Sequence, residues 1–275
     1  MNQIAKEILI KTKRKLFSAN LGNNQSQFLG NGMDFSELRE YHYGDDVRKI
    51  NHKASAKEQK PYINLFNEER ELNIVLVFMV GGSIYFGTKR LKQELMAEIL
   101  SLLAFSAIKN RDRVSTLFFS NKEEYFKKPS KNINILNEIV PEAIEIDPLK
   151  KDANYDEVAN LLLHRVKQKS LIFIIGDFYK EIDFSQIARK HELFCIVVRD
   201  KFEEDPLFRG ESELIDPVSL KEIDLNISPS ILNEYKREIA QHDKKLFEHF
   251  LSNKIRYTKI YTDEDPFFKL NNLVR

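Results

Sequence analysis

The sequence predicts an α/β fold in which helices cover both faces of a mainly parallel β-sheet. Short apolar runs rich in β-branched residues, such as NIVLVFMV at 73–80 and LIFII at 171–175, are typical of strands buried on both faces. Longer segments with apolar residues at helical spacing lie between these runs. This alternation of strands and helices favours right-handed crossovers within one sheet.

The elements of the α/β region follow one another along residues 73–275. The strand at 73–80 leads through two glycines into a helix at 90–110, whose apolar residues recur three or four positions apart. Further strands are expected at 112–120, 170–178, 193–200 and 255–262, and further helices at 132–143, 155–168, 184–191 and 227–253. Ser228 followed by proline is a favoured start for the last of these helices. The charged segment at 122–129 is interpreted as an exposed hairpin or loop.

Residues 1–72 do not follow this alternation, and we expect them to form a separate unit ahead of the α/β domain at 73–275. The unit should comprise an N-terminal helix and a polar arm that is irregular or β-rich, because glycines interrupt it repeatedly. The arm is expected to pack beside the sheet through apolar side chains. The expected anchors are Phe35, Leu38, Tyr41, Val47 and Ile50.

Composition excludes several classes of protein. The 43 basic and 42 acidic side chains give a net charge of +1, so no global field favours nucleic acid. Cys195 lies in the apolar run LFCIVV and has no second cysteine to pair with, which is typical of a buried thiol in a reducing compartment. The longest apolar runs are much shorter than the ~20 residues of a membrane span, and the N-terminus does not resemble a secretory signal. We therefore expect a cytoplasmic protein.

Two strand ends are the expected place for a ligand, because open α/β sheets bind ligands at the carboxyl ends of their strands. They are MVGGSIYFG at 79–87 and IIGDF at 174–178. Neither has the GxGxxG spacing of a dinucleotide site, and the chain has no GxxxxGK[ST], CxxC, HExxH or EF-hand motif. The sequence thus predicts no cofactor.

The segment at 30–57 is dense in charged, histidine and tyrosine side chains. Asp45 and Asp46 follow a glycine and predict a turn. Arg39 and Arg48 flank this turn at distances that allow bidentate pairs with carboxylates. Such a network fixes one conformation, so we favour a structural or partner-binding role.

An enzymatic role for the same segment is the alternative. Asp45 or Asp46 could act as a general base with His42 or His52 as its partner. Geometry must support such a pair, and the spacing of these residues does not establish it. We therefore expect no catalytic residue here.

The chain resembles the bacterial family called domain of unknown function 58, which contains a degenerate von Willebrand factor A-like domain. The stretch LGNNQSQFLGNGMDFSELREYHYGDDVRKINHKASAK follows the family's G-x-G-x-D-F and R-x-Y-x-x-G-D-x-x-R-x-I patterns. The matching positions include Gly30, Gly32, Asp34, Phe35, Arg39, Tyr41, Gly44, Asp45, Arg48 and Ile50. His52 departs from the pattern, because the family usually has tryptophan there.

The resemblance also implies where a metal-ion-dependent adhesion site would lie. A-type domains carry D-x-S-x-S after the first strand, and its oxygens hold Mg²⁺. The corresponding positions here are Met79, Gly81 and Ser83, and Asp177 corresponds to the aspartate of the family's S-D-F motif. Ser83 and Asp177 alone offer too few oxygens for an octahedral ion, so we expect a degenerate site with no metal, or weak Mg²⁺ binding as the alternative.

What the resemblance implies about function is a non-catalytic adaptor that works with a MoxR-type AAA+ ATPase in a chaperone-like system. Its partner-facing surfaces would be the arm at 30–57 and the strand-end loops at 79–88 and 176–180. The alternative, from another class, is a hydrolase or phosphate-handling enzyme. That enzyme would use Asp45, Asp177 and His42.

Overall fold

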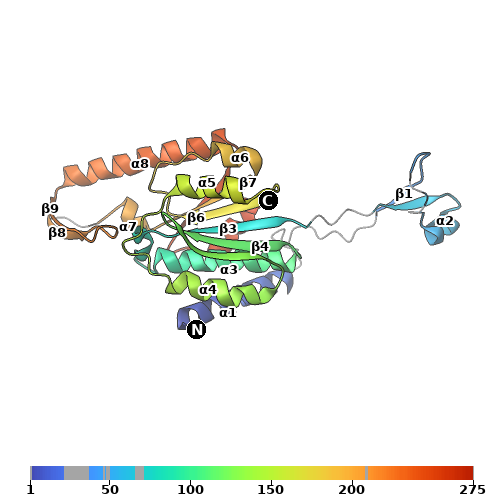
Figure 1. Cartoon of the computed structure of the whole chain (residues 1–275), viewed down its shortest axis with the longest axis horizontal. Coiled ribbons are helices and arrows are strands. Elements are labelled where there is room, and N and C mark those ends of the chain that lie inside the picture. Colours follow the sequence, from blue (N-terminus) through green and yellow to red (C-terminus); the bar gives the residue numbers. More distant parts are fainter. Residues whose placement is uncertain are drawn as a thin grey trace.

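The structure is a computed structural model that describes residues 2–21, 37–45, 47, 50–65, 71–207 and 210–274. Its centre is a six-stranded sheet of order β10-β7-β6-β3-β4-β5 (Figure 1). All neighbouring strands are parallel except β4 and β5, which are antiparallel. The strands are β3 (Asn73–Met79), β4 (Arg113–Phe119), β5 (Glu123–Ser130), β6 (Leu171–Gly176), β7 (Glu192–Arg199) and β10 (Arg256–Tyr261). The predicted α/β fold with a mainly parallel sheet is confirmed.

Helices flank both faces of this sheet. One group comprises α1 (Gln3–Leu21), α3 (Lys92–Lys109), α4 (Leu136–Glu145, after a 3₁₀ turn at Ile133–Ile135) and α9 (Pro266–Val274). The other comprises α5 (Tyr155–Arg165), α6 (Ser185–Lys190) and α8 (Pro229–Ser252). Figure 1 shows these groups on opposite sides of the sheet. Within the described residues, no helix has both the length and the apolar character needed to cross a membrane.

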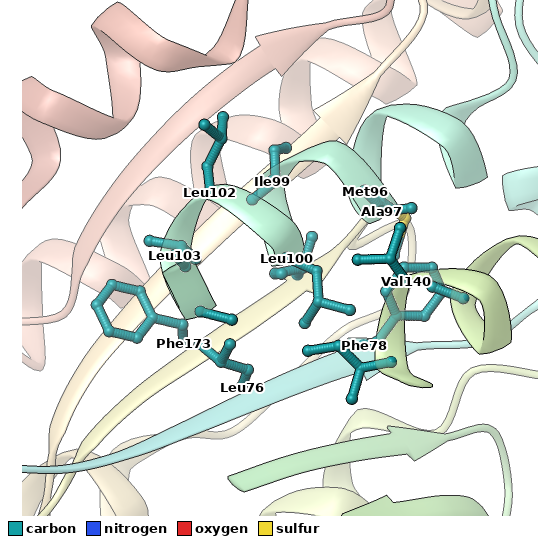
Figure 2. Packing of buried hydrophobic residues seen from close by; sticks show 14 of the residues in the cluster. Leu76, Phe78, Met96, Ala97, Ile99, Leu100, Leu102, Leu103, Val140 and Phe173 are labelled. Carbon is teal, nitrogen blue, oxygen red and sulfur yellow. The ribbon is translucent and has the colours of Figure 1, made fainter. Parts of the chain in front are cut away.

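The strand β3 contributes to both hydrophobic cores because its side chains alternate between the two faces. Leu76 and Phe78 belong to the core beneath α3 and are fully buried. Figure 2 shows them close to Leu100 and Leu103 of that helix. The intervening residues of β3 join the second core, beneath α5 and α8. Such burial on both faces explains the continuous apolar run in the sequence.

The N-terminal helix α1 packs on α3 and α4 and takes part in the first core. Its Thr12 hydroxyl donates to Ser101 of α3 at 2.9 Å. Lys11 and Lys15 both bind the buried carboxylate of Glu98. This helix therefore packs with residues 73–275, although it precedes the polar arm in the chain.

The polar arm contains β1 (Glu37–Glu40), α2 (His52–Glu58) and β2 (Tyr62–Leu65). The two strands are antiparallel, and the Asn51 side chain caps α2 by accepting from the Ala54 amide at 3.0 Å. Figure 1 shows these elements away from the six-stranded sheet. The expectation that the arm packs beside the sheet is therefore wrong for them, and Val47, an expected anchor, is exposed. Phe35 lies outside the described residues.

Two strand pairings lie outside the list of predicted strands. The first is that of β5, formed largely by the segment at 122–129, which pairs antiparallel with β4 as a hairpin, one of the two interpretations of this segment, and extends the sheet beyond β4. The second is an antiparallel ribbon of β8 (Gly210–Ile215) and β9 (Glu222–Ile227), which lies between α7 (Lys201–Glu204) and α8. The ribbon's turn reaches the carboxyl end of the main sheet, where the Lys150 amide donates to the Pro217 carbonyl at 3.0 Å.

Candidate functional site

The candidate site lies at the carboxyl ends of β3, β6 and β7, which are neighbours in the sheet. Ser83 lies in a 3₁₀ turn (Gly82–Tyr85) after β3, and Asp177 directly follows β6. Arg199 is the last residue of β7, and Lys92 is the first residue of α3. Because parallel strands end at the same edge, these four side chains from distant parts of the sequence meet there.

Lys92 is fully buried and supplies a cation inside this edge. Its Nζ lies 3.4 Å from the Asp177 carboxylate and 2.5 Å from that of Glu203 in α7. The ammonium also lies 5.1 Å from the centre of the Tyr179 ring, a favourable cation–π distance. A buried charge is tolerated only when it is paired in this way.

Asp177 is only 3% exposed and is held in its charged form. Burial alone would raise the pKa of its carboxyl group, but the Lys92 ammonium and a hydrogen bond from Ser83 keep that pKa below the usual value. The Tyr155 hydroxyl lies 3.4 Å from the carboxylate and accepts from the Phe178 amide at 2.9 Å. The carboxylate is thus neutralised by groups of the same chain.

The pKa of the Glu203 carboxyl group is shifted in the opposite direction to that of Asp177. Its burial raises the pKa of the carboxyl group above the usual value, although the Lys92 ammonium acts against that rise. The second carboxylate oxygen accepts from the Asp200 amide at 3.0 Å, within a capping box at the start of α7. Lys92 thus joins the start of α7 to the end of β6.

Arg199 forms a second buried ion pair beside the first. Its guanidinium donates to Asp243 of α8 at 3.0 Å and to the Phe178 carbonyl at 3.3 Å. The guanidinium carbon also lies 3.5 Å from the centre of the Tyr179 ring. Lys259 of β10 completes the pairing of Asp243 at 2.7 Å. The Tyr179 ring therefore lies in contact with both Arg199 and Lys92.

The Asp200 carboxylate links its own segment to those of Thr88 and Thr262 at the same edge. It accepts from the amide and the hydroxyl of Thr88 at 2.8 and 2.9 Å, and from the Thr262 hydroxyl. Burial would raise the pKa of Asp200, but these hydrogen bonds, with that of Thr262 foremost, keep it below the usual value. The oxygens of Asp200 are occupied by structural bonds.

The four positions that the resemblance assigns to an adhesion site are partly brought together. Ser83 lies beside Asp177 and helps to lower the pKa of its carboxyl group. Met79 is 1% exposed and packs in the second core instead. At Gly81, an added Cβ would lie 3.1 Å from the Cβ of Ala153, closer than such atoms normally pack. A serine therefore does not fit at that position unless Ala153 moves.

The arm residues form a separate polar network. One terminal nitrogen of Arg39 donates to both carboxylate oxygens of Asp45, at 2.8 and 2.9 Å. The other lies 2.8 Å from Nδ1 of His42. The His42 amide and then Arg39 lower the pKa of Asp45. Tyr41 bonds through its amide to the Pro61 carbonyl, and His52 begins α2 with an exposed side chain.

Three of the predicted network residues cannot be placed, because Asp34, Asp46 and Arg48 lie outside the described residues. The residues of the enzymatic alternative are not brought together. Asp45 and His42 lie in the arm, whereas Asp177 is buried at the edge of the main sheet (Figure 1). No shared site of these three residues forms in this structure.

Sequence reasoning missed Lys92, Glu203, Arg199 and Asp243, which provide most of the charge at this edge. A signal for the first was available, because Lys92 shares its helical spacing with Leu95, Met96 and Ile99, which are all buried. Its position therefore indicated a lysine on the buried face of α3. Arg199 likewise ends a strand whose last seven residues are buried.

The fold and this edge define a mixed α/β protein with a mainly parallel six-stranded sheet and a buried ionic cluster at the carboxyl ends of its strands. The sequence model of a family described as "Protein of unknown function DUF58" matches residues 37–245, which is more than half of the chain. The chain belongs to that family, which the resemblance had indicated.

Similar proteins add no assigned activity. Uncharacterized proteins of Mycobacterium bovis and Mycobacterium tuberculosis are 24% identical over 241 residues, covering 85% of this chain and 76% of theirs. Among solved structures, a conserved hypothetical protein BatB from Bacteroides thetaiotaomicron is 12% identical with a TM-score of 0.45, over 74% of this chain and 97% of its own. An aerotolerance-related membrane protein from Bacteroides fragilis, with multiple mutations to serine, is 10% identical with a TM-score of 0.46, over 74% and 98%.

Proposed function

We propose that this chain is a non-catalytic protein-binding adaptor with a von Willebrand factor A-like domain, in which a lysine ammonium takes the place of the adhesion-site metal ion. One observation carries the proposal: the buried Nζ of Lys92 lies 3.4 Å from the carboxylate of Asp177. The charge that a cation would neutralise is therefore already neutralised from within the chain.

The chemistry of this edge disfavours a resident divalent ion. Mg²⁺ requires near-octahedral coordination by oxygens, and Met79 and Gly81 provide no side-chain oxygen. An ion at Asp177 would also be repelled by the nearby Lys92 ammonium. We infer that partners are recognised by direct contacts between proteins, without a bridging metal.

The surface beside this edge suits such contacts. Tyr85 and Phe86, in the loop after β3, are 54% and 37% exposed. Phe86 lies 6.1 Å from the ring of Phe202 in α7. Aromatic side chains are enriched in protein interfaces, and these two lie within the 79–88 loop that the family resemblance implies is partner-facing. Family membership supports a MoxR-type AAA+ ATPase as the partner to test first.

The test is a binding measurement between the purified chain and the MoxR-type ATPase of the same organism, by biolayer interferometry with Mg·ATP and with Mg·ADP. We expect saturable binding that the double variant Tyr85→Ser/Phe86→Ser weakens at least about tenfold, because aromatic anchors carry much of an interface's energy. The matched control is Phe268→Ser, at an exposed aromatic residue of α9. No binding in either nucleotide state, or equal losses in both variants, would contradict the proposal.

A further inference from the structure

The β8–β9 ribbon has the properties of an incomplete sheet. Its two strands pair only with each other among the strands that the structure describes. Among the described strands, none neighbours the outer edge of β8 or of β9, and such edges are templates for the addition of a further strand.

The two faces of the ribbon differ in chemistry. Side chains alternate along each strand, and directly paired residues share a face. Leu214 is paired with Ile223 on one face, where they are 39% and 50% exposed. Every acidic residue of the two strands lies on the opposite face. We call this the acidic face: Glu211, Glu213, Glu222 and Asp224.

The acidic face contains a repulsive contact. Glu213 and Asp224 are direct cross-strand partners, and like charges in this arrangement destabilise a sheet. All four carboxylates of this face are on exposed residues. None of them forms an ion pair with a described residue. The described residues therefore do not neutralise this repulsion, and a basic group from a binding partner would.

We infer that the β8–β9 ribbon binds a third strand from a partner protein, an extended segment in which apolar and basic residues alternate. An added strand would place its apolar side chains beside Leu214 at the β8 edge, or beside Ile223 at the β9 edge, and its basic side chains on the acidic face. The inference rests on the protein-binding function proposed above and adds the chemistry of a partner.

The ribbon is held in place for this role at both of its ends. At the turn, the Pro217 carbonyl accepts from the Lys150 amide. The turn also packs so closely on Gly82 that a Cβ there would lie 2.6 Å from the Pro217 oxygen. At the other end, Ile227 is 5% exposed and leads into α8. A preformed edge loses less conformational entropy on binding than a mobile one.

The probe is a fluorescein-labelled decapeptide of alternating lysine and valine, measured with the whole chain by fluorescence anisotropy. A block peptide, five lysines followed by five valines, has the same composition but lacks the alternation. We expect the alternating peptide to bind at least about tenfold more tightly than the block peptide and than an alternating glutamate–valine peptide. Equal affinity for the two basic peptides would overturn the inference, because charge alone would then explain the binding.

Matched variants separate the ribbon from the rest of the surface. Glu213→Gln/Asp224→Asn removes the like-charge pair, and Glu145→Gln/Glu157→Gln removes two exposed carboxylates elsewhere. We expect about tenfold weaker peptide binding for the first variant and an unchanged affinity for the second. The melting temperature of the first should equal or exceed that of the unaltered chain. A lower melting temperature would indicate a structural role for the pair and contradict the inference.

A second copy of this chain would be a different occupant of the same edge. If size-exclusion chromatography shows a dimer whose fraction changes in the ribbon variant, a second copy covers the ribbon and the inference is wrong. The adaptor proposal can fail independently of this one. If the peptide binds and the ATPase does not, only the ATPase partnership is contradicted. If the ATPase binds and the peptide does not, only the ribbon inference is contradicted.

Discussion

The carboxyl edge of the main sheet and the β8–β9 ribbon both contain several charged side chains, but only those at the edge are paired with opposite charges of described residues. At the edge, the carboxylates of Asp177 and Asp243 lie against Lys92 and Arg199, and both pairs are largely buried. On the ribbon, exposed carboxylates face one another without a described cation. The contrast teaches that charges neutralised within the chain hold the fold together, while charges left unneutralised at the surface are available to partners.

The largest expected effect comes from removing the cation of the sheet edge. Lys92→Ala leaves the carboxylates of Asp177 and Glu203 buried without their partner, and we expect a loss of about 3–5 kcal/mol in the free energy of unfolding. The exposed Lys89, three residues earlier, is the control, and Lys89→Ala should change the free energy of unfolding by less than about 0.5 kcal/mol. Urea denaturation measures both, and equal effects would show that the edge is not held by its cation.

The next effect concerns Gly81, which the family resemblance assigns to an adhesion-site position. Gly81→Ser forces its side chain against Ala153, and we expect a loss of about 1–3 kcal/mol from overpacking. In the Ala153→Gly background the loss should be smaller but not abolished, because the methyl contact is removed while the backbone nitrogen of residue 153, 3.2 Å from the added Cβ, remains. A double-mutant cycle by thermal denaturation measures this coupling. Additive effects would indicate that Ala153 does not occupy the serine position.

The pH dependence of stability gives a further test of the edge. The folded-state pKa of Asp200 lies below its usual value of 3.8. Its contribution to stability is therefore fully present above about pH 4 and is lost as the pH falls through the lower, folded-state pKa. We expect the free energy of unfolding to fall less steeply below pH 4 in Asp200→Asn than in the unaltered chain. Identical slopes would contradict the assignment.

The smallest expected effect lies in the polar arm. Arg39 and Asp45 form a partly exposed pair, so Arg39→Gln should change stability little. The pKa of Asp45 should rise, but not fully to its usual value, because the His42 amide still donates to the carboxylate. A carboxyl NMR titration measures this shift. An unchanged pKa would mean that the pair does not form in solution.

Sequence reasoning predicted the main sheet because its strands are buried on both faces. In β3 and β6 nearly every side chain enters one core or the other, and this produces continuous apolar runs. The ribbon was missed for the opposite reason. Its strands, GESELI and EIDLNI, are short and acidic, and most of their described side chains are exposed. Burial in a core therefore does not impose an apolar pattern on them.

The charged cluster was missed because its pairs are distant in the sequence. Lys92 meets Asp177 across 85 residues, and Arg199 meets Asp243 across 44. A lone lysine or arginine at the end of an apolar segment is usually solvated, and only the tertiary fold supplies the buried carboxylate. Ser83 and Asp177 were named in advance because they lie in the two strand-end segments and because the family resemblance assigns them to adhesion-site positions.

We propose that the ammonium of Lys92 stands where a divalent ion would bind, and isothermal titration calorimetry with Mg²⁺ and Mn²⁺ tests this most directly. We expect no saturable heat for the unaltered chain up to millimolar ion. Saturable binding that disappears in Asp177→Asn would contradict it, because the carboxylate would then be holding a metal ion despite the lysine beside it.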